Sequence, residues 1–184
     1  MKRIVRKGLF ESNSSSSHSL VITGATTTEV PDPWLNKDGM LTIWDEDDLA
    51  FDRRPQPPLI KFEDKLRYLI AAYSQNKEKI NEIIETVKRI VPDCKGIEFP
   101  YRRNLHQYDI EVDSYGYIDH QSSHILRNYL EKHNVSFEEF LTHDKYVIVL
   151  DGDEYDMWGS FKASGLINED FIEKEIGIYD EDYY

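Results

Sequence analysis

Apolar side chains recur with the period of an α-helix over residues 63–91, which is the clearest pattern in the sequence. They fall at Leu66, Leu69, Ile70 and Tyr73, and continue at Ile80, Ile83, Ile84, Val87 and Val91. Spacings of three and four residues place these side chains on one helix face. The step from Tyr73 to Ile80 keeps the phase, so the pattern fits one long helix, or a helical hairpin that turns at the polar residues 74–77. Pro92 ends the helix in either arrangement.

Short apolar runs with β-branched residues predict the strands. The run Tyr146–Leu150 is apolar throughout, so we expect it to be buried on both faces and to be central in its sheet. The segment 108–113 alternates strictly, which indicates a strand with one face in water. The predicted strands are residues 2–6, 19–23, 40–44, 97–99, 108–113 and 146–150.

Capping signals predict three shorter helices. One helix carries Ile125, Leu126, Tyr129 and Leu130 and takes Asp119 or Ser122 as its cap. A second begins at the capping box Ser136-x-x-Glu139, and a third runs from Asn168 to a stop at Gly177. The elements together predict a single α+β domain over 1–184, with a small mixed or antiparallel sheet packed by the helices. The segment 63–91 is a candidate insertion, and the acidic tail 180–184 is expected to fray.

Composition narrows the class of protein further. Hydrophobic residues make up 40 % of the 184, enough for a packed core, and the net charge is −13. Nonspecific nucleic-acid binding needs a basic face and is therefore not expected. The single cysteine, Cys94, excludes an internal disulfide and suits a reducing compartment. The chain has neither the apolar run of a signal peptide nor the ~20 apolar residues of a membrane span, so we expect a cytoplasmic protein.

Three polar clusters stand at the boundaries of predicted elements, where binding residues commonly lie. The first comprises Glu11, Asn13, Ser14, Ser15, Ser16, Ser17 and His18. The second comprises Asp119, His120, Gln121, Ser122 and His124, and the third Asp151, Asp153 and Glu154. If the strands bring these clusters together, they form one site.

Such a site admits more than one chemistry. The imidazoles of His18 and His120 with the carboxylates of Asp151 and Asp153 suit a divalent metal that activates water. Without a metal, a serine could act as nucleophile, with His18 or His120 as base and Asp119 orienting it. The serine loop could also hold a phosphate with its backbone N–H groups. Each residue could instead have a purely structural role. The serines could form a linker, His18 could serve as a hydrogen-bonding residue of the fold, and Asp119 could cap a helix.

Two of the clusters also carry a family resemblance. The residues Arg6-Lys-Gly-Leu-Phe-Glu-Ser-Asn-Ser-Ser-Ser-Ser-His-Ser-Leu20 resemble the opening of a group of small, uncharacterised proteins of bacteriophages and prophages of Gram-positive bacteria. That group has Phe-Glu-Thr-Asn-Ser-Ser-Ser-x-His-Ser, so Ser12 here replaces its usual threonine. Gly-Tyr-Ile-Asp-His-Gln-Ser at 116–122 is similar to the group's second motif, and 149–153 is a looser third match. The resemblance implies a phage origin but no particular activity.

Two functions are therefore expected. The first is an enzyme-like site, such as that of a hydrolase, which binds or acts on a phosphate-bearing or nucleotide-like ligand in the host bacterial cytoplasm. His18, Asp119 and His120 would be its catalytic residues. Glu11, Asn13, Ser14–Ser16, Gln121 and Ser122 would be its ligand-binding residues. The second is a non-catalytic acidic inhibitor of a host defence or nucleic-acid-binding protein. Acidic residues gathered on one convex face, with the clusters far apart, would favour the inhibitor.

Overall fold

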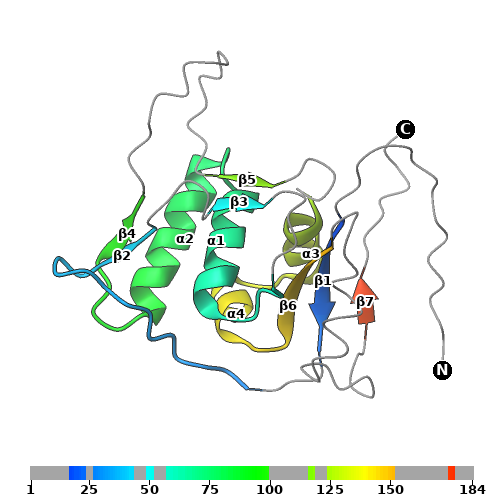
Figure 1. Cartoon of the computed structure of the whole chain (residues 1–184), viewed down its shortest axis with the longest axis horizontal. Helices are drawn as coiled ribbons and strands as arrows, with labels where there is room; N and C mark the ends of the chain where they lie inside the picture. The colour runs from blue at the N-terminus through cyan, green and yellow to red at the C-terminus, as the bar shows by residue number, and fades with distance from the viewer. Residues whose placement is uncertain are drawn as a thin grey trace, which may run out of the picture.

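The computed structural model describes residues 17–23, 27–43, 49–51, 57–99, 116–118, 124–151 and 174–176. Within these ranges the chain is α+β, as predicted, with four helices and three small sheets (Figure 1). The predicted strands 2–6 and 108–113 and the tail 180–184 lie outside the described residues. No helix in the described ranges is both long and apolar enough to cross a membrane.

The segment 63–91 forms the hairpin and not the single long helix. Helix α1 spans Phe62–Ala72 and α2 spans Lys77–Ile90. The turn ends at Asn76, whose side chain accepts a hydrogen bond of 3.0 Å from the backbone N–H of Lys79. This N-cap satisfies one of the free N–H groups at the start of α2 and so stabilises a new helix start at the point where one helix could have continued. Helix α2 ends just before Pro92, as expected.

Two shorter helices follow. Helix α3 spans Ile125–His133 and α4 spans Phe137–Thr142. Ser136 caps α4 by accepting a hydrogen bond of 3.1 Å from the Glu139 N–H, as the capping box predicts. The predicted cap of α3 is wrong: the N-cap is His124, because α3 starts at Ile125 and Asp119 and Ser122 stand too far upstream.

The largest sheet is antiparallel, with the order β6–β1–β7. Its strands are β1 (Ser17–Ile22), β6 (Tyr146–Asp151) and β7 (Lys174–Ile176). The prediction for 146–150 is confirmed in its burial, since all five side chains are almost inaccessible. The central strand, however, is β1. Among the described residues, strand β6 has β1 on one side and, on the other, a bridge from Leu59 to Ile148.

Strand β7 corrects another prediction. Residues 174–176 were expected in the helix that follows Asn168, but they pair with Leu20, Val21 and Ile22 of β1. Strand β6 pairs with one edge of β1 and leaves the backbone donors and acceptors of the other edge in need of partners. Pairing with β7 satisfies these groups, a tertiary gain that overrides a local helix preference. The rest of the predicted helix lies outside the described residues.

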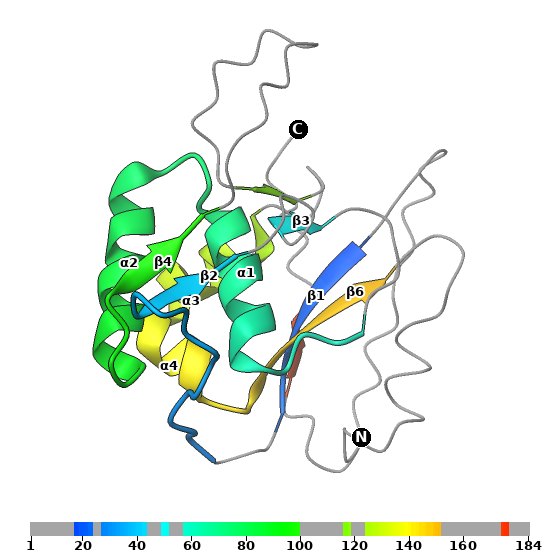
Figure 2. The same cartoon turned by 60° about the vertical axis from the view of Figure 1, so that its left-hand side comes forward.

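Two parallel strand pairs complete the fold. Strand β2 (Met40–Thr42) pairs with β4 (Gly96–Glu98), and β3 (Ala50–Phe51) pairs with β5 (Tyr117–Ile118). Figure 1 shows the β2–β4 pair beside α2 and β1 with β6 on the far side of α1, and Figure 2 shows β2 and β4 in front of the hairpin. The hairpin thus lies at the centre of the described fold, and its buried side chains join one hydrophobic cluster with those of β1, β6, α3 and α4.

Candidate functional site

Most of the predicted site residues lie outside the described residues: Glu11, Asn13, Ser14, Ser15, Ser16, Asp119, His120, Gln121, Ser122 and Asp153. The described ones are His18, with its side chain, and the backbone of Asp151. The assignment of catalytic, ligand-binding and metal-binding roles therefore stays a prediction. The structure does show where the described residues next to each cluster lie.

His18 lies in β1 and is only 2 % exposed. Its Nδ1 is 3.1 Å from Oη of Tyr68, a residue of α1 that is equally buried. Burial raises the pKa of the Tyr68 phenol, so this group stays protonated at any physiological pH. The hydrogen bond fixes the orientation of the imidazole ring and couples the first polar cluster to the central helix.

Tyr68 also connects His18 with β3, the partner of the strand that precedes the second cluster. The Phe51 ring packs edge-on against Tyr68, with ring centroids 5.0 Å apart. Phe51 is the register partner of Ile118 in the parallel β3–β5 pair, and Ile118 directly precedes Asp119. The buried Tyr68 side chain therefore contacts both His18 and β3, and β3 pairs with β5, the strand that leads into the second cluster.

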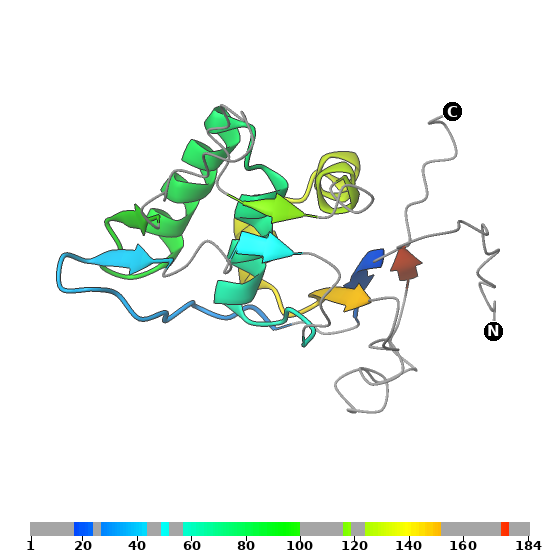
Figure 3. The same cartoon turned by 45° about the horizontal axis from the view of Figure 1, so that its top comes forward.

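The other end of the second cluster is also held near β1. The cluster runs from Asp119 to His124, and α3 begins at Ile125. Helix α3 packs against both β1 and α1, while β5 packs against α1. Figure 3 shows β3 and β5 running in the same direction, toward α3 and β1. Both chain ends that flank residues 119–123 are thus anchored on the elements that surround His18.

The third cluster begins beside the first. In the antiparallel β1–β6 pair, Ser17 is opposite Asp151 and His18 is opposite Leu150. Antiparallel strands bring the start of one strand to the end of its neighbour, so the serine loop enters β1 where residues 151–154 leave β6. The structure therefore brings the described edges of all three clusters to one end of the β1–β6 pair.

Sequence reasoning missed two buried polar residues of α1, Tyr68 and Lys65. The Lys65 ammonium donates to the backbone oxygens of Phe140 (2.9 Å) and His143 (3.0 Å), and its side chain is 2 % exposed. Burial lowers the pKa of Lys65 to about 8, partly offset by the carboxylates of Asp144 and Glu29. The signal was present, because Lys65 stands four residues before Leu69 and so on the apolar stripe.

A metal site is not formed by the described residues alone. Among them no three histidine, cysteine, aspartate or glutamate side chains gather as metal ligands would. Of the metal candidates, His120 and Asp153 lie outside the described ranges, as does the side chain of Asp151. The proposed divalent metal thus stays a prediction that depends on those residues.

Comparisons with protein-family models, with curated proteins and with solved structures find no match to this chain.

Proposed function

We propose that the three polar clusters meet at the end of the β1–β6 pair, and that the protein binds a small phosphate-bearing or nucleotide-like ligand there. The observation that supports this is the convergence of the cluster edges around Tyr68: Ser17 opposite Asp151, His18 bonded to Tyr68, and Phe51 between Tyr68 and Ile118. Hydroxyls, imidazoles and carboxylates brought to one place from distant parts of a chain are the usual ingredients of a polar ligand site.

The roles follow from the chemistry of each group. Asn13 and Ser14–Ser16 would hold phosphate oxygens with side-chain and backbone donors, and Gln121 and Ser122 would add polar contacts from the opposite segment. Asp119 and His120 would supply a proton acceptor close to the ligand, and Glu11 a further polar contact. His18 would be the base or ligand that Tyr68 orients. A divalent metal held by His120, Asp151 and Asp153 would offset the phosphate charge. As a phage product, the protein would act in the host bacterial cytoplasm.

The second candidate, an acidic inhibitor of a host protein, gains less support. The inhibitor hypothesis would be supported by polar clusters that lie far apart and by carboxylates gathered on one convex face. The described edges of the first and third clusters instead lie opposite each other on neighbouring strands, and Tyr68 contacts both His18 and Phe51. A binding site between these segments accounts for that arrangement, and an inhibitor surface does not need it.

The test is a thermal-shift screen of the full chain with inorganic phosphate, nucleoside mono-, di- and triphosphates, each with and without Mg²⁺. A ligand present at 100 times its dissociation constant should stabilise the fold by about 2.7 kcal/mol. The Ser15→Ala and His120→Ala variants should lose most of this gain while keeping the ligand-free melting temperature. Ser74→Ala, in the turn between α1 and α2 and outside the three polar clusters, is the matched control and should respond as the original chain does.

Turnover is tested separately, by following phosphate release from each ligand that shifts the melting temperature. Release that needs His120 and Asp119 would make the site a hydrolase, whereas binding without release would make it a ligand-holding site. If no phosphate compound raises the melting temperature with or without Mg²⁺, the proposal is wrong.

A further inference from the structure

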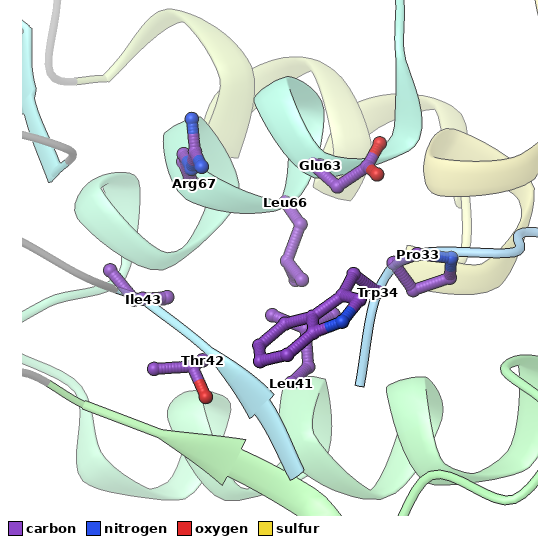
Figure 4. Close-up of a pocket in the computed structure, with 8 residues that line it drawn as sticks. All are labelled: Pro33, Trp34, Leu41, Thr42, Ile43, Glu63, Leu66 and Arg67. Atoms are coloured by element: carbon purple, nitrogen blue, oxygen red, sulfur yellow. The ribbon is translucent and has the colours of Figure 1, made fainter. Parts of the chain in front are cut away.

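A second feature is a hollow of about 140 Å³ between α1 and the segment that leads into β2 (Figure 4). Leu41, Ile43 and Leu66 supply its apolar surface, and Trp34 with Pro33 forms one wall. Glu63, in the first turn of α1, lies at its edge. None of these residues belongs to the three polar clusters.

Trp34 is held outward by the backbone that carries it. Side chains alternate along this extended segment: Pro31 and Pro33 are buried, whereas Val30, Asp32 and Trp34 are exposed. Trp34 is 62 % exposed and Val30 76 %, and they are the exposed large hydrophobic residues of the described ranges. Two buried prolines restrict the backbone, so the indole is presented without a large entropy cost on binding.

The next residues hold this segment in place. The Asn36 side-chain oxygen accepts from the N–H groups of Asp38 and Met40, both at 2.9 Å, and its amide nitrogen donates to Glu98 at 2.9 Å. Because Glu98 belongs to β4, these bonds attach the Trp34 segment to the β2–β4 pair. The wall of the hollow is therefore preformed.

The volume and the lining restrict what fits. A volume near 150 Å³ holds a molecule of about the size of benzene, while sites for small-molecule ligands measure roughly 300–1,000 Å³. The hollow thus suits one side chain. Its surfaces are an aliphatic floor, an indole face and a carboxylate, which together match a long apolar stem with a positive end.

The surrounding charge points the same way. Asp32 stands on the Trp34 segment, and Asp64 follows Glu63 on α1, with Lys61 just before the helix. Arg67 also borders the hollow, but it forms an ion pair of 3.8 Å with Asp64, and Figure 4 shows its guanidinium directed away from Trp34. With a net charge of −13, the whole chain attracts basic partners.

We infer that this hollow is the docking site for a lysine side chain of a basic protein segment, with the aliphatic stem on Leu41 and Leu66, and the ammonium between the Trp34 indole and the Glu63 carboxylate. Exposed tryptophan is enriched among residues that dominate binding energy at protein interfaces. This surface is separate from the strand-end site, so it operates whether or not that site binds phosphate compounds.

The test is a titration of the full chain with hexalysine, followed by isothermal titration calorimetry and by the ¹⁵N-indole resonances, with hexaglutamate as the control peptide. The Trp34 resonance, identified by its loss in Trp34→Leu, should move with hexalysine only. Trp34→Leu should weaken hexalysine binding by about fivefold, the value of an exposed cation–π contact. Glu63→Gln should weaken it by about threefold, as expected for an exposed ion pair.

Glu78→Gln is the matched charge control, because Glu78 is exposed in the first turn of α2, at the end of the hairpin opposite Glu63. It should change the affinity by less than about 1.5-fold if the contact is local. Equal losses in Glu63→Gln and Glu78→Gln, or a Trp34 resonance that does not move, would show diffuse attraction and overturn the inference. Sedimentation provides the other check: self-association that Trp34→Leu abolishes would make a second copy of this chain the occupant, which also overturns it.

Discussion

At the scale of single residues, Tyr68 carries more of the candidate site than any other described residue. It is the contact through which His18 in β1 and Phe51 in β3 are connected. Its phenol oxygen is the only part of the ring that differs from phenylalanine, so Tyr68→Phe removes the hydrogen bond to His18 and leaves the packing in place. A buried polar group that loses its partner costs about 1–3 kcal/mol.

We therefore expect Tyr68→Phe to lower the free energy of unfolding by about 1–3 kcal/mol, measured by urea denaturation. The proposed ligand should also bind more weakly, because the imidazole orientation is no longer fixed. Tyr73→Phe is the matched control on the same helix: its ring packs against Phe137, and this contact survives the loss of the hydroxyl. Equal stability of Tyr68→Phe and the original chain would mean that the 3.1 Å contact contributes nothing.

Lys65 leads to a prediction about pH. Burial lowers its pKa to about 8 in the folded chain, whereas the ordinary value of 10.5 applies when the chain is unfolded. Between these values Lys65 is more often protonated in the unfolded chain than in the folded one, so its contribution to stability rises as pH increases from 8 to 10.5. Below pH 8 both forms are protonated, and the cost of the buried charge, roughly 3 kcal/mol, is present in full.

The measurement is the free energy of unfolding at intervals from pH 7 to pH 10.5 for the original chain and for Lys65→Met. Methionine fills similar space but does not titrate, so the variant should lose the rise that Lys65 contributes above pH 8. Lys88→Met, in α2, where the lysine side chain is 37 % exposed, should keep it. Parallel curves for Lys65→Met and the original chain would contradict a lowered pKa.

At the scale of elements, the turn between α1 and α2 depends on Asn76. Its side chain accepts the 3.0 Å hydrogen bond from Lys79 N–H, and an N-cap of this kind contributes about 1 kcal/mol. Asn76→Ala should lower the free energy of unfolding by that amount, and Asn76→Asp should restore it, because aspartate caps equally well. The Gln75→Ala variant, one residue earlier in the exposed turn, is the control. A stable Asn76→Ala variant would indicate that core packing alone sets the turn.

The hairpin also shows a limit of prediction from hydrophobic periodicity. The apolar stripe identified both helices, but it kept its phase across residues 74–77, so periodicity could not separate one helix from two. The choice came from the Asn76 cap and from burial of both helices against α3, α4 and the strands. Strand β7 is the opposite case: local signals around Asn168 favour a helix, but the open edge of β1 takes residues 174–176 as a strand. Local sequence does not report an edge that a distant strand leaves open.

The candidate site was predictable only in part for the same reason. The three polar clusters could be recognised as strings, and His18 was among the residues named. The proximity of their described edges depends on the β1–β6 register and on the β3–β5 pair, which join residues far apart in the chain. Tyr68 was missed because it stands among the apolar residues of α1, where a phenol reads as part of the core. Its role needs a partner, His18, that lies 50 positions away.

At the scale of the whole molecule, the described fold is a helical hairpin with strand pairs on opposite sides, and Gly116 determines how closely β5 approaches it. A Cβ at Gly116 would lie 2.8 Å from the Leu49 carbonyl oxygen and 3.1 Å from Cβ of Ala71 in α1. Neither neighbour can move without shifting backbone. Gly96, with nearly the same φ (+156° against +157°), would meet only the flexible side chain of Met40. The two glycines therefore have equal backbone demands and differ in the space around them.

We expect Gly116→Ala to lower the free energy of unfolding by about 1–3 kcal/mol more than Gly96→Ala, the usual cost of overpacking. Because any backbone strain is common to both variants, the difference between their free energies of unfolding measures the cost of crowding where β5 packs closely against Leu49 and α1. The second cluster begins at residue 119, directly after β5. A displaced β5 should therefore also weaken the binding of any phosphate compound that the thermal-shift screen identifies. Gly96→Ala should leave that binding unchanged. Equal effects of the two substitutions on stability and binding would mean that the second cluster does not depend on how β5 packs against α1.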